Sequence, residues 1–532
     1  MRRVPYGLVR RGVYRPQPRR ASTVSNPPVQ ITTLSNKIRV ATESTPGHFS
    51  SVGLYIDAGS RYEDPSTSGV SHFLDRMAFK VRTLISFLQS TDSMSDAEMS
   101  TAINSLGGQI ACSSSRETIM YQSSHFHQAT PLAMSLISDT LQNASFLEEE
   151  LEAQRDAARY EIREINAKPE MILPEILHMV AYGGTGLGNP LLCPEDRIDV
   201  IDRPMLRNFM KEWYRPERMV IAGAGVDHLE LVELADKYFS SLKYTPVENP
   251  APSTARPASL NTQVPPHVLA ASSPSLMKSL TRAASSYLYP NLSLNGTQRV
   301  GSSHLGSTYT GGHHHIFDPD AEFHHIYIAF EGVGIHDADI YDLATMQVLL
   351  GGGGSFSAGG PGKGMYSRLY THILNHHTQI DHCASFHHIY TDSSLFGLFA
   401  SFIPAESTRH GNTAAQILPH LVHQLSLLLY RPVPESELNR AKNQLKSSLA
   451  MALESRAVEV EDLGRQLLVH NRKVPVSEMS EKIDQVTPES LQRVALRIFG
   501  PQSDSKPTIV TMGREDIGNW ESTFKKYDVG SP

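Results

Sequence analysis

The chain has 532 residues, of which 40% are hydrophobic and 19% are charged, a composition typical of a folded protein with more than one domain. Its formal net charge of −7 lacks the basic excess typical of nucleic-acid binding, and no window holds the roughly 20 apolar residues of a membrane span. The three cysteines, Cys112, Cys193 and Cys383, form no CxxC pair, which excludes a cysteine zinc site and a disulfide framework.

The first 36 residues contain seven arginines and no acidic residue. An arginine-rich opening with serine and threonine towards its end is typical of a mitochondrial transit peptide. We therefore assign residues 1–36 to such a peptide and expect cleavage at an unspecified bond somewhere after Arg20. The remainder of the chain then carries a formal charge of −14, because the leader contributes all seven of those positive charges.

Two stretches of the chain repeat the same order of elements. An alternating strand pattern at 49–64 recurs about 275 residues later, and a charged helical pattern at 148–165 recurs at 435–453. Each repeat then continues with a helix start near a proline, Pro204 or Pro488, and a final apolar strand. The pattern predicts two duplicated α+β domains at 37–245 and 320–525.

Residues 246–319 separate the two repeats. They are rich in proline, serine, alanine and glycine, and no acidic residue lies between Glu248 and Asp318. Such a composition does not bury enough apolar surface to offset the entropy of ordering, so we predict a flexible linker. The run His313 to His315 falls inside this predicted linker.

The segment that follows the first predicted strand contains the pattern HxxDR. Its members are His72, Asp75 and Arg76, and the pattern resembles HxxEH, the inverted zinc motif of pitrilysin-type metallopeptidases. The resemblance implies a pitrilysin-like α/β sandwich for each domain. It also implies that Glu161, on a later helix, stands where that family has its third zinc ligand.

The chemistry of this pattern argues against zinc. Arg76 stands where the motif has its second histidine, yet a guanidinium has no lone pair to donate and stays protonated at pH 7. His72 and Glu161 alone fall short of the three protein ligands that catalytic zinc normally has. Asp75 is one methylene shorter than the glutamate that activates water. We therefore predict no metal and no catalysis, and a polar cluster in which Arg76 pairs with Asp75 or Glu161.

The spacing between Arg76 and Glu161 is 85 residues, about ten more than the resemblance implies. Removing Val81 to Gln89 restores the expected spacing. Two interpretations stay open: a loop insertion, or a retained intron translated in the gene sequence. The sequence of the transcript distinguishes them.

A second unusual segment, residues 351–364, contains eight glycines and is called the glycine-rich segment below. It lacks the Walker pattern because Lys363 is followed by Gly364. The residues before it have helical rather than strand periodicity, which argues against a dinucleotide fingerprint. Many glycines predict instead a mobile surface segment that contacts diverse peptides through its main chain.

The glycine-rich segment, the degenerate HFLDR and the strings YTGG, IAFEGVG and SFHHIYTDSSLFGLFASF together resemble the alpha subunits of mitochondrial processing peptidases. The resemblance covers about residues 36–525 and implies a non-catalytic subunit in the mitochondrial matrix. Its implied partners are a zinc-bearing beta subunit and the presequences of imported precursors. Its implied substrate-binding residues are Gly351, Gly352, Gly353, Gly354, Ser355, Phe356, Gly359, Gly360, Gly362, Lys363 and Gly364.

Two other functions remain open from the sequence. One is a structural core subunit of respiratory complex III, whose relatives share the duplicated fold, and the other is an independent zinc metallopeptidase. Basic presequences also favour acidic contacts on the protein. The acidic residues near the second repeat are either such contacts or solvated surface charges; they are Glu331, Asp337, Asp339, Asp381 and Asp392.

Overall fold

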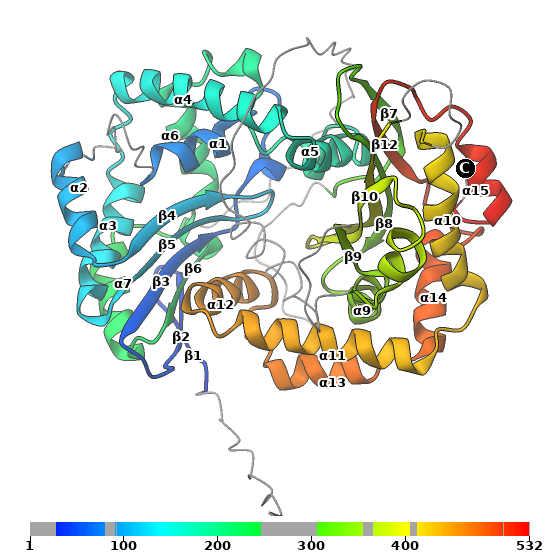
Figure 1. The fold of residues 1–532 in the computed structure, drawn as a ribbon. Helices are drawn as coiled ribbons and strands as arrows, with labels where there is room; N and C mark the ends of the chain where they lie inside the picture. Colours follow the sequence, from blue (N-terminus) through cyan, green and yellow to red (C-terminus); the bar gives the residue numbers. More distant parts are fainter. Residues whose placement is uncertain are drawn as a thin grey trace, which may run out of the picture.

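The computed structural model describes residues 28–79, 91, 93–245, 306–354, 365–404, 412–503 and 505–530. These residues form two halves, each built on a six-stranded sheet with helices packed on it (Figure 1). The segment Val81 to Gln89, residues 246–305 and residues 355–364 lie outside the described residues.

The first half contains a sheet with the strand order β1-β2-β6-β3-β5-β4. Strand β2 runs parallel to β6, and the other neighbouring pairs are antiparallel. Its strands are β1 Gln30–Thr33, β2 Arg39–Glu43, β3 Phe49–Ile56, β4 Gln109–Ser114, β5 Ile119–Phe126 and β6 Met219–Ala224. Its helices are α1 Val70–Met77, α2 Asp96–Ser105, α3 Thr130–Gln142, α4 Glu148–Asn166, α5 Pro169–Ala181, α6 Arg203–Trp213 and α7 His228–Phe239.

The second half contains a sheet with the order β7-β12-β8-β11-β10-β9. Strand β7 runs parallel to β12, and the other pairs are antiparallel. Its strands are β7 Gly312–Phe317, β8 His324–Val333, β9 Gly352–Gly354, β10 Ile380–Ile389, β11 Ser393–Phe402 and β12 Thr508–Gly513. Its helices are α9 Ile340–Leu350, α10 Ala414–Tyr430, α11 Glu435–Ala452, α12 Arg456–His470, α13 Val476–Asp484, α14 Pro488–Phe499 and α15 Glu521–Tyr527.

The two sheets confirm the duplication. The order β2-β6-β3-β5-β4 in the first sheet corresponds to β7-β12-β8-β11-β10 in the second, and the first two strands of each run form the parallel pair. The sixth strand differs: β1 lies beyond β2 in the first sheet, whereas β9 lies beyond β10, at the opposite edge, in the second. The glycine-rich segment therefore begins with a strand that has no counterpart among the described strands of the first half.

Each sheet is buried on both faces because the halves exchange one helix. In β3, Val52 and Leu54 pack into the core of the first half, whereas Tyr55 points to the other face and packs against α12 of the second half. The second sheet is arranged alike, since β8 turns Tyr327 and Ala329 towards α5 of the first half. Figure 1 shows α12 beside the first sheet and α5 beside the second. This exchange sets how the two halves sit relative to each other.

A buried polar joint also connects the halves. Arg61, whose side chain is 2% exposed, forms ion pairs with Glu117 of its own half and Asp392 of the other half. The backbone N–H of Thr391 donates to Glu117 Oε2 at 3.1 Å. The turn between β10 and β11 is thereby held against the turn between β4 and β5.

Two boundaries differ from those expected from composition. Residues 30–33 form β1, which pairs with β2, so the leader predicted to end at residue 36 overlaps the first sheet. Residues 312–317, placed in the linker, form β7, so the histidine run belongs to the second sheet. Both strands are short or polar edge strands, which hydrophobic alternation does not reveal. In the described ranges, no helix is both long and apolar enough to cross a membrane.

We expect Gly464→Ala to destabilise the protein. An added Cβ on this residue of α12 would lie 2.1 Å from Cδ2 of Tyr55, and overpacking of this kind costs about 1–3 kcal/mol. This loss should exceed the gain of about 1 kcal/mol in helix propensity. The measurement is urea unfolding. The control, Met451→Ala in the last turn of α11, removes a side chain that is 60% exposed. An unfolding free energy equal to or above that of the native protein would contradict the close approach.

Candidate functional site

The degenerate zinc motif lies on α1, a short buried helix. Gly69 precedes the helix with a φ of +91°, and a Cβ there would lie 2.4 Å from Cys193 Sγ, so glycine is required. The Glu63 carboxylate accepts hydrogen bonds from the backbone N–H groups of Gly69 and Ser71 at 2.9 and 2.6 Å. Burial raises the pKa of Glu63 to about 7, against the opposing effect of these two hydrogen bonds. Glu63 therefore fixes the start of the helix.

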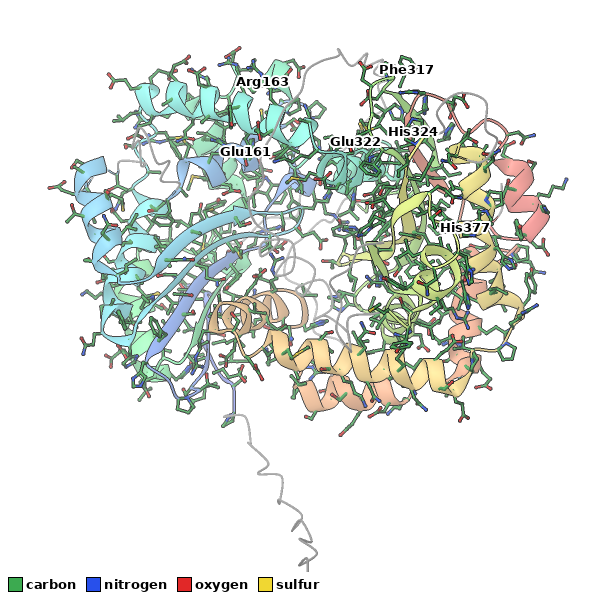
Figure 2. The ribbon with its side chains drawn as sticks, in the orientation of Figure 1. Glu161, Arg163, Phe317, Glu322, His324 and His377 are labelled. Carbon is green, nitrogen blue, oxygen red and sulfur yellow. The ribbon has the colours of Figure 1, made fainter. Side chains whose placement is uncertain are left out.

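Arg76 and Glu161 form the centre of the site. The Arg76 guanidinium makes an ion pair with Glu161 Oε2, and His72 Nε2 lies 3.6 Å from the same oxygen. Arg76 and His72 are 5% and 3% exposed, and Glu161 reaches them from α4 with a side chain that is 33% exposed. Figure 2 marks the position of Glu161. The structure brings together three of the four predicted positions. Of the two pairings considered for Arg76, this one is formed.

His72 is also held in an unsuitable state for binding zinc. The backbone N–H of Cys193 donates to His72 Nδ1 at 3.2 Å. A neutral imidazole that accepts at Nδ1 carries its proton on Nε2. The Nε2 atom that faces Glu161 then has no lone pair to give a metal. Burial raises the pKa of the Cys193 thiol to about 12, so this cysteine does not supply a thiolate either.

Asp75 points to a different neighbour. Its Oδ2 accepts from the backbone N–H and the hydroxyl of Ser114, both at 3.3 Å, at the end of β4. The carboxylate that resembles the general base of the motif thus ties α1 to the sheet. Within the described ranges, no cluster of three histidine, cysteine or acidic side chains is arranged to hold a metal.

The described start of the glycine-rich segment is built tightly into the second half. Gly351 ends α9 with a φ of +59°, and a Cβ there would lie 2.4 Å from Ser367 Cβ. Gly352 has a φ of +106°, and its Cβ would lie 2.1 Å from the Cys383 carbonyl oxygen. Both positions therefore require glycine for reasons of packing and backbone conformation.

Residues that sequence reasoning missed anchor the start of this segment and the chain that follows it. Ser385 donates its backbone N–H and its hydroxyl to the Gly351 carbonyl, at 2.9 and 3.1 Å. Ser367 Oγ accepts from the Gly352 N–H at 3.0 Å, and Arg368 next to it pairs with Glu437 at 2.7 Å. No motif marks these residues. The only signal in the sequence is that Ser367 and Arg368 lie three and four residues after the last glycine, Gly364.

Gly353 and Gly354 differ from the two glycines before them. A Cβ on Gly353 would meet nothing within 4 Å, and one on Gly354 would meet only His382 Cδ2, at 3.5 Å. Packing within the described chain does not require glycine at either position. The remaining predicted substrate-binding residues, 355–364, lie outside the described residues.

Four of the acidic residues considered for basic peptides pair with side chains that can be named within the chain. Asp337 and Asp339 pair with arginines of α14, and Asp392 pairs with Arg61. Glu331 accepts from the Ser393 hydroxyl at 3.0 Å. These four carboxylates thus serve the fold, and any attraction of cations by them is reduced by their partners.

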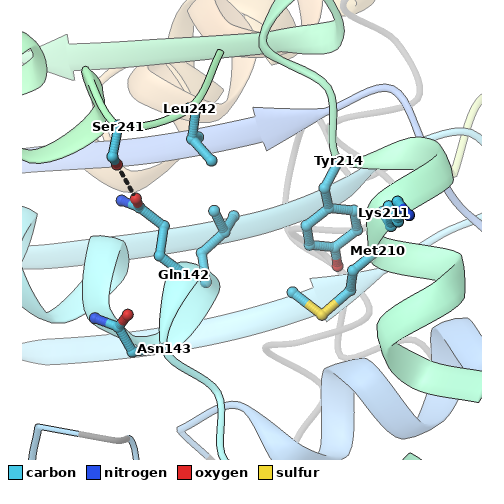
Figure 3. A pocket seen from close by; sticks show the side chains of 8 residues that line it. Gln142, Asn143, Met210, Lys211, Tyr214, Ser241 and Leu242 are labelled. Carbon is cyan, nitrogen blue, oxygen red and sulfur yellow. Dashed lines mark hydrogen bonds between the residues drawn. The ribbon is translucent and has the colours of Figure 1, made fainter. Parts of the chain in front are cut away.

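A pocket of about 330 Å³ lies elsewhere in the first half (Figure 3). Leu141, Gln142, Asn143, Met210, Lys211, Tyr214, Ser241 and Leu242 line it, and Ser241 donates to Gln142 Oε1. None of the predicted site residues is among them. The pocket is therefore separate from both the α1 site and the glycine-rich segment.

Comparisons with known proteins agree with this arrangement. Residues 39–195 match the family Insulinase (Peptidase family M16), and residues 201–445 match the Peptidase M16 inactive domain. The mitochondrial-processing peptidase subunit alpha of Neurospora crassa is 45% identical, over 90% of this chain and 85% of that protein. The human subunit alpha is 33% identical, over 91% of this chain and 82% of that protein.

Two solved structures share the fold. One is a chain of complex III2 from Candida albicans with Inz-5 bound, with a TM-score of 0.69 and 17% identity, over 94% of this chain and 99% of that one. The other is a protease from Helicobacter pylori, with a TM-score of 0.70 and 17% identity, over 92% of this chain and 100% of that one. At this identity the likeness concerns the fold.

We expect Arg76→Met to destabilise the protein by about 2 kcal/mol, because it leaves the Glu161 carboxylate near His72 without its cation. The estimate is below that of a fully buried pair because Glu161 is one third exposed. The double variant Arg76→Met/Glu161→Met should recover most of the loss. Urea unfolding measures all three proteins, and losses that simply add in the double variant would contradict the coupling.

We expect Glu63→Gln to change how stability depends on pH. Its folded pKa of about 7 lies above the ordinary 4.5, so the native protein loses stability as pH rises between these values, by about 2–3 kcal/mol. The variant lacks this loss, so its unfolding free energy relative to the native protein should rise between pH 5 and pH 8. The exposed Glu195→Gln is the control. A difference that is independent of pH would contradict the raised pKa.

Proposed function

Because the chain belongs to peptidase family M16, among its processing-peptidase alpha subunits, we propose that it is the non-catalytic, substrate-binding subunit of a mitochondrial processing peptidase. The observation that carries this proposal is the ion pair of Arg76 with Glu161. A cation that stays protonated stands where a zinc ligand would be needed, and its partner is the carboxylate that would complete the zinc site.

Catalysis then belongs to a partner subunit. A beta-type subunit with an intact HxxEH motif supplies the zinc and the water-activating glutamate, while this chain supplies binding surface. The substrates are the presequences of imported precursors, which are basic. The formal charge of −14 on the chain beyond residue 36 attracts them over distances that salt screens.

The site of action is the mitochondrial matrix. The seven arginines within the first 20 residues support import. Four of the acidic residues near the second repeat are paired inside the chain, so the attraction comes from the net charge rather than from these four contacts.

A core subunit of respiratory complex III is the alternative that shares this fold, as the Candida albicans complex illustrates. The glycine-rich segment favours peptide binding over a purely structural role, because a structural subunit has no need of it. Fractionation separates the two functions: a processing subunit is recovered with a soluble partner, and a core subunit with the membrane complex. An independent zinc peptidase is disfavoured by Arg76 and by the proton on His72 Nε2.

We expect the isolated chain to cleave no presequence, and the chain with its beta-type partner to cleave it. Replacing residues 355–364 by a Gly-Ser linker of half the length should lower kcat/KM of the pair by at least about tenfold. The described residues on both sides of this segment remain unchanged, so the thermal midpoint should not move. Presequence cleavage assays measure the effect.

The matched control replaces the same residues by a Gly-Ser linker of full length. It should retain most of the activity if a long flexible main chain is what the peptide needs. Chelator-sensitive cleavage by the isolated chain, or full activity with the shortened linker, would overturn the proposal.

A further inference from the structure

Strand β9 makes the second sheet one strand wider on the side that bears the glycine-rich segment. It consists of Gly352–Gly354 and pairs with β10 through Ala384, Cys383 and His382. Among the described strands none lies beyond it, so β9 is the outermost strand of its sheet. Figure 1 places β9 on the side of the second half that faces the first half.

The pairing fixes which main-chain groups point outward. The Ser385 N–H donates to the Gly351 carbonyl, so these two residues form a hydrogen-bonded pair. Such pairs alternate along an antiparallel ladder, which assigns Gly353 to β10 and turns the main chains of Gly352 and Gly354 away from it. The Gly352 N–H indeed leaves the sheet, because it donates to Ser367 Oγ at 3.0 Å. Gly354 therefore directs its N–H and its carbonyl to the outer edge.

Gly353 requires glycine for its φ of +158°, whereas the absence of a side chain at Gly354 has no explanation in the described residues. Gly351 and Gly352 are required by close contacts, whereas a Cβ on Gly353 or Gly354 would enter nearly open space. An exposed strand edge promotes pairing with other chains, and proteins usually protect it with charged residues or proline. The three residues of β9 itself carry no charged side chain and no proline, so nothing within this strand hinders the approach of another backbone.

The chemistry of the substrate fits such an edge. Strand addition uses main-chain hydrogen bonds, so it tolerates diverse sequences. Presequences are diverse and basic, and the chain beyond its leader carries a formal charge of −14. Tyr366, which is 77% exposed, directly precedes Ser367, the residue that accepts from the Gly352 N–H, and its ring is available to apolar or cationic side chains.

We propose that an extended stretch of the presequence adds to the second sheet along the outer edge of β9 and pairs with the main chain of Gly354. The inference rests on the proposed function and gives it a binding geometry. A helical presequence would not use this edge, because its own main chain is already hydrogen-bonded.

Disulfide trapping tests the geometry in the complete pair. Gly354→Cys introduces a thiol at a half-buried position on the strand edge, whereas Cys112, Cys193 and Cys383 are buried. Presequence peptides that each carry one cysteine, at successive positions, are then cross-linked to it. An added strand should give maxima at every second peptide position, because side chains alternate between the faces of a sheet. Ser522→Cys, exposed on α15, supplies the background.

A second comparison removes the outward donor. Gly354→Pro lacks an N–H and should raise KM for the peptide by roughly threefold to tenfold, the range expected for one lost hydrogen bond. Gly354→Ala keeps the N–H and should raise KM less than the proline variant does. The stability of both variants is checked by thermal unfolding. If the proline variant is destabilised, the trapping experiment alone tests the proposed binding geometry.

The outcomes separate the two proposals. Cross-links with a spacing of three to four residues, cross-links no stronger than the Ser522→Cys background, or equal KM values for the proline and alanine variants would overturn binding at β9. The first two outcomes leave substrate binding by this chain intact if the native pair still cleaves the peptide. A native pair that neither binds nor cleaves presequences would instead overturn the proposed function.

Discussion

The reciprocal docking of α5 and α12 is the constraint on which the arrangement of the two halves depends. Each sheet has a face that its own half leaves uncovered, and the helix lent by the other half packs against that face. Because an uncovered apolar sheet face is unfavourable in water, neither half is complete alone. The close approach of Gly464 to Tyr55 and the buried Arg61 joint then fix the angle between the halves. The angle between the halves in turn determines that β9, in the second half, faces the first half.

The α1 site shows how a metal centre is replaced by a stable polar contact. Arg76 supplies the positive charge that a metal would have brought to Glu161, and the Cys193 N–H keeps the His72 lone pair at Nδ1 occupied. Asp75 is engaged with Ser114. The helices α1 and α4 thereby keep the arrangement typical of the family without the chemistry. The contacts that stabilise this site are also the contacts that exclude a metal ion.

The sequence predicted the parts of this structure that depend on local pattern. Alternation and helix periodicity indicated two duplicated halves, and the chemistry of Arg76 indicated its pairing with a carboxylate. The exchange of α5 and α12 was not predictable, because an apolar helix face does not specify which sheet covers it. Cys193, Ser367 and Ser385 were missed because their roles come from turns and strands distant in sequence. The glycines at 351–364 were treated as one segment, whereas Gly351 and Gly352 meet packing demands that Gly353 and Gly354 do not.

The exchanged helix also has a consequence for biogenesis. A chain that is threaded through a translocation channel from its amino end delivers β6, the last strand of the first sheet, long before α12 arrives. Until then Tyr55 and Val220 have no cover from the second half. The early folding intermediate should therefore expose an apolar sheet surface and bind general chaperones. Release of the chain from these chaperones should coincide with the appearance of residues 456–470.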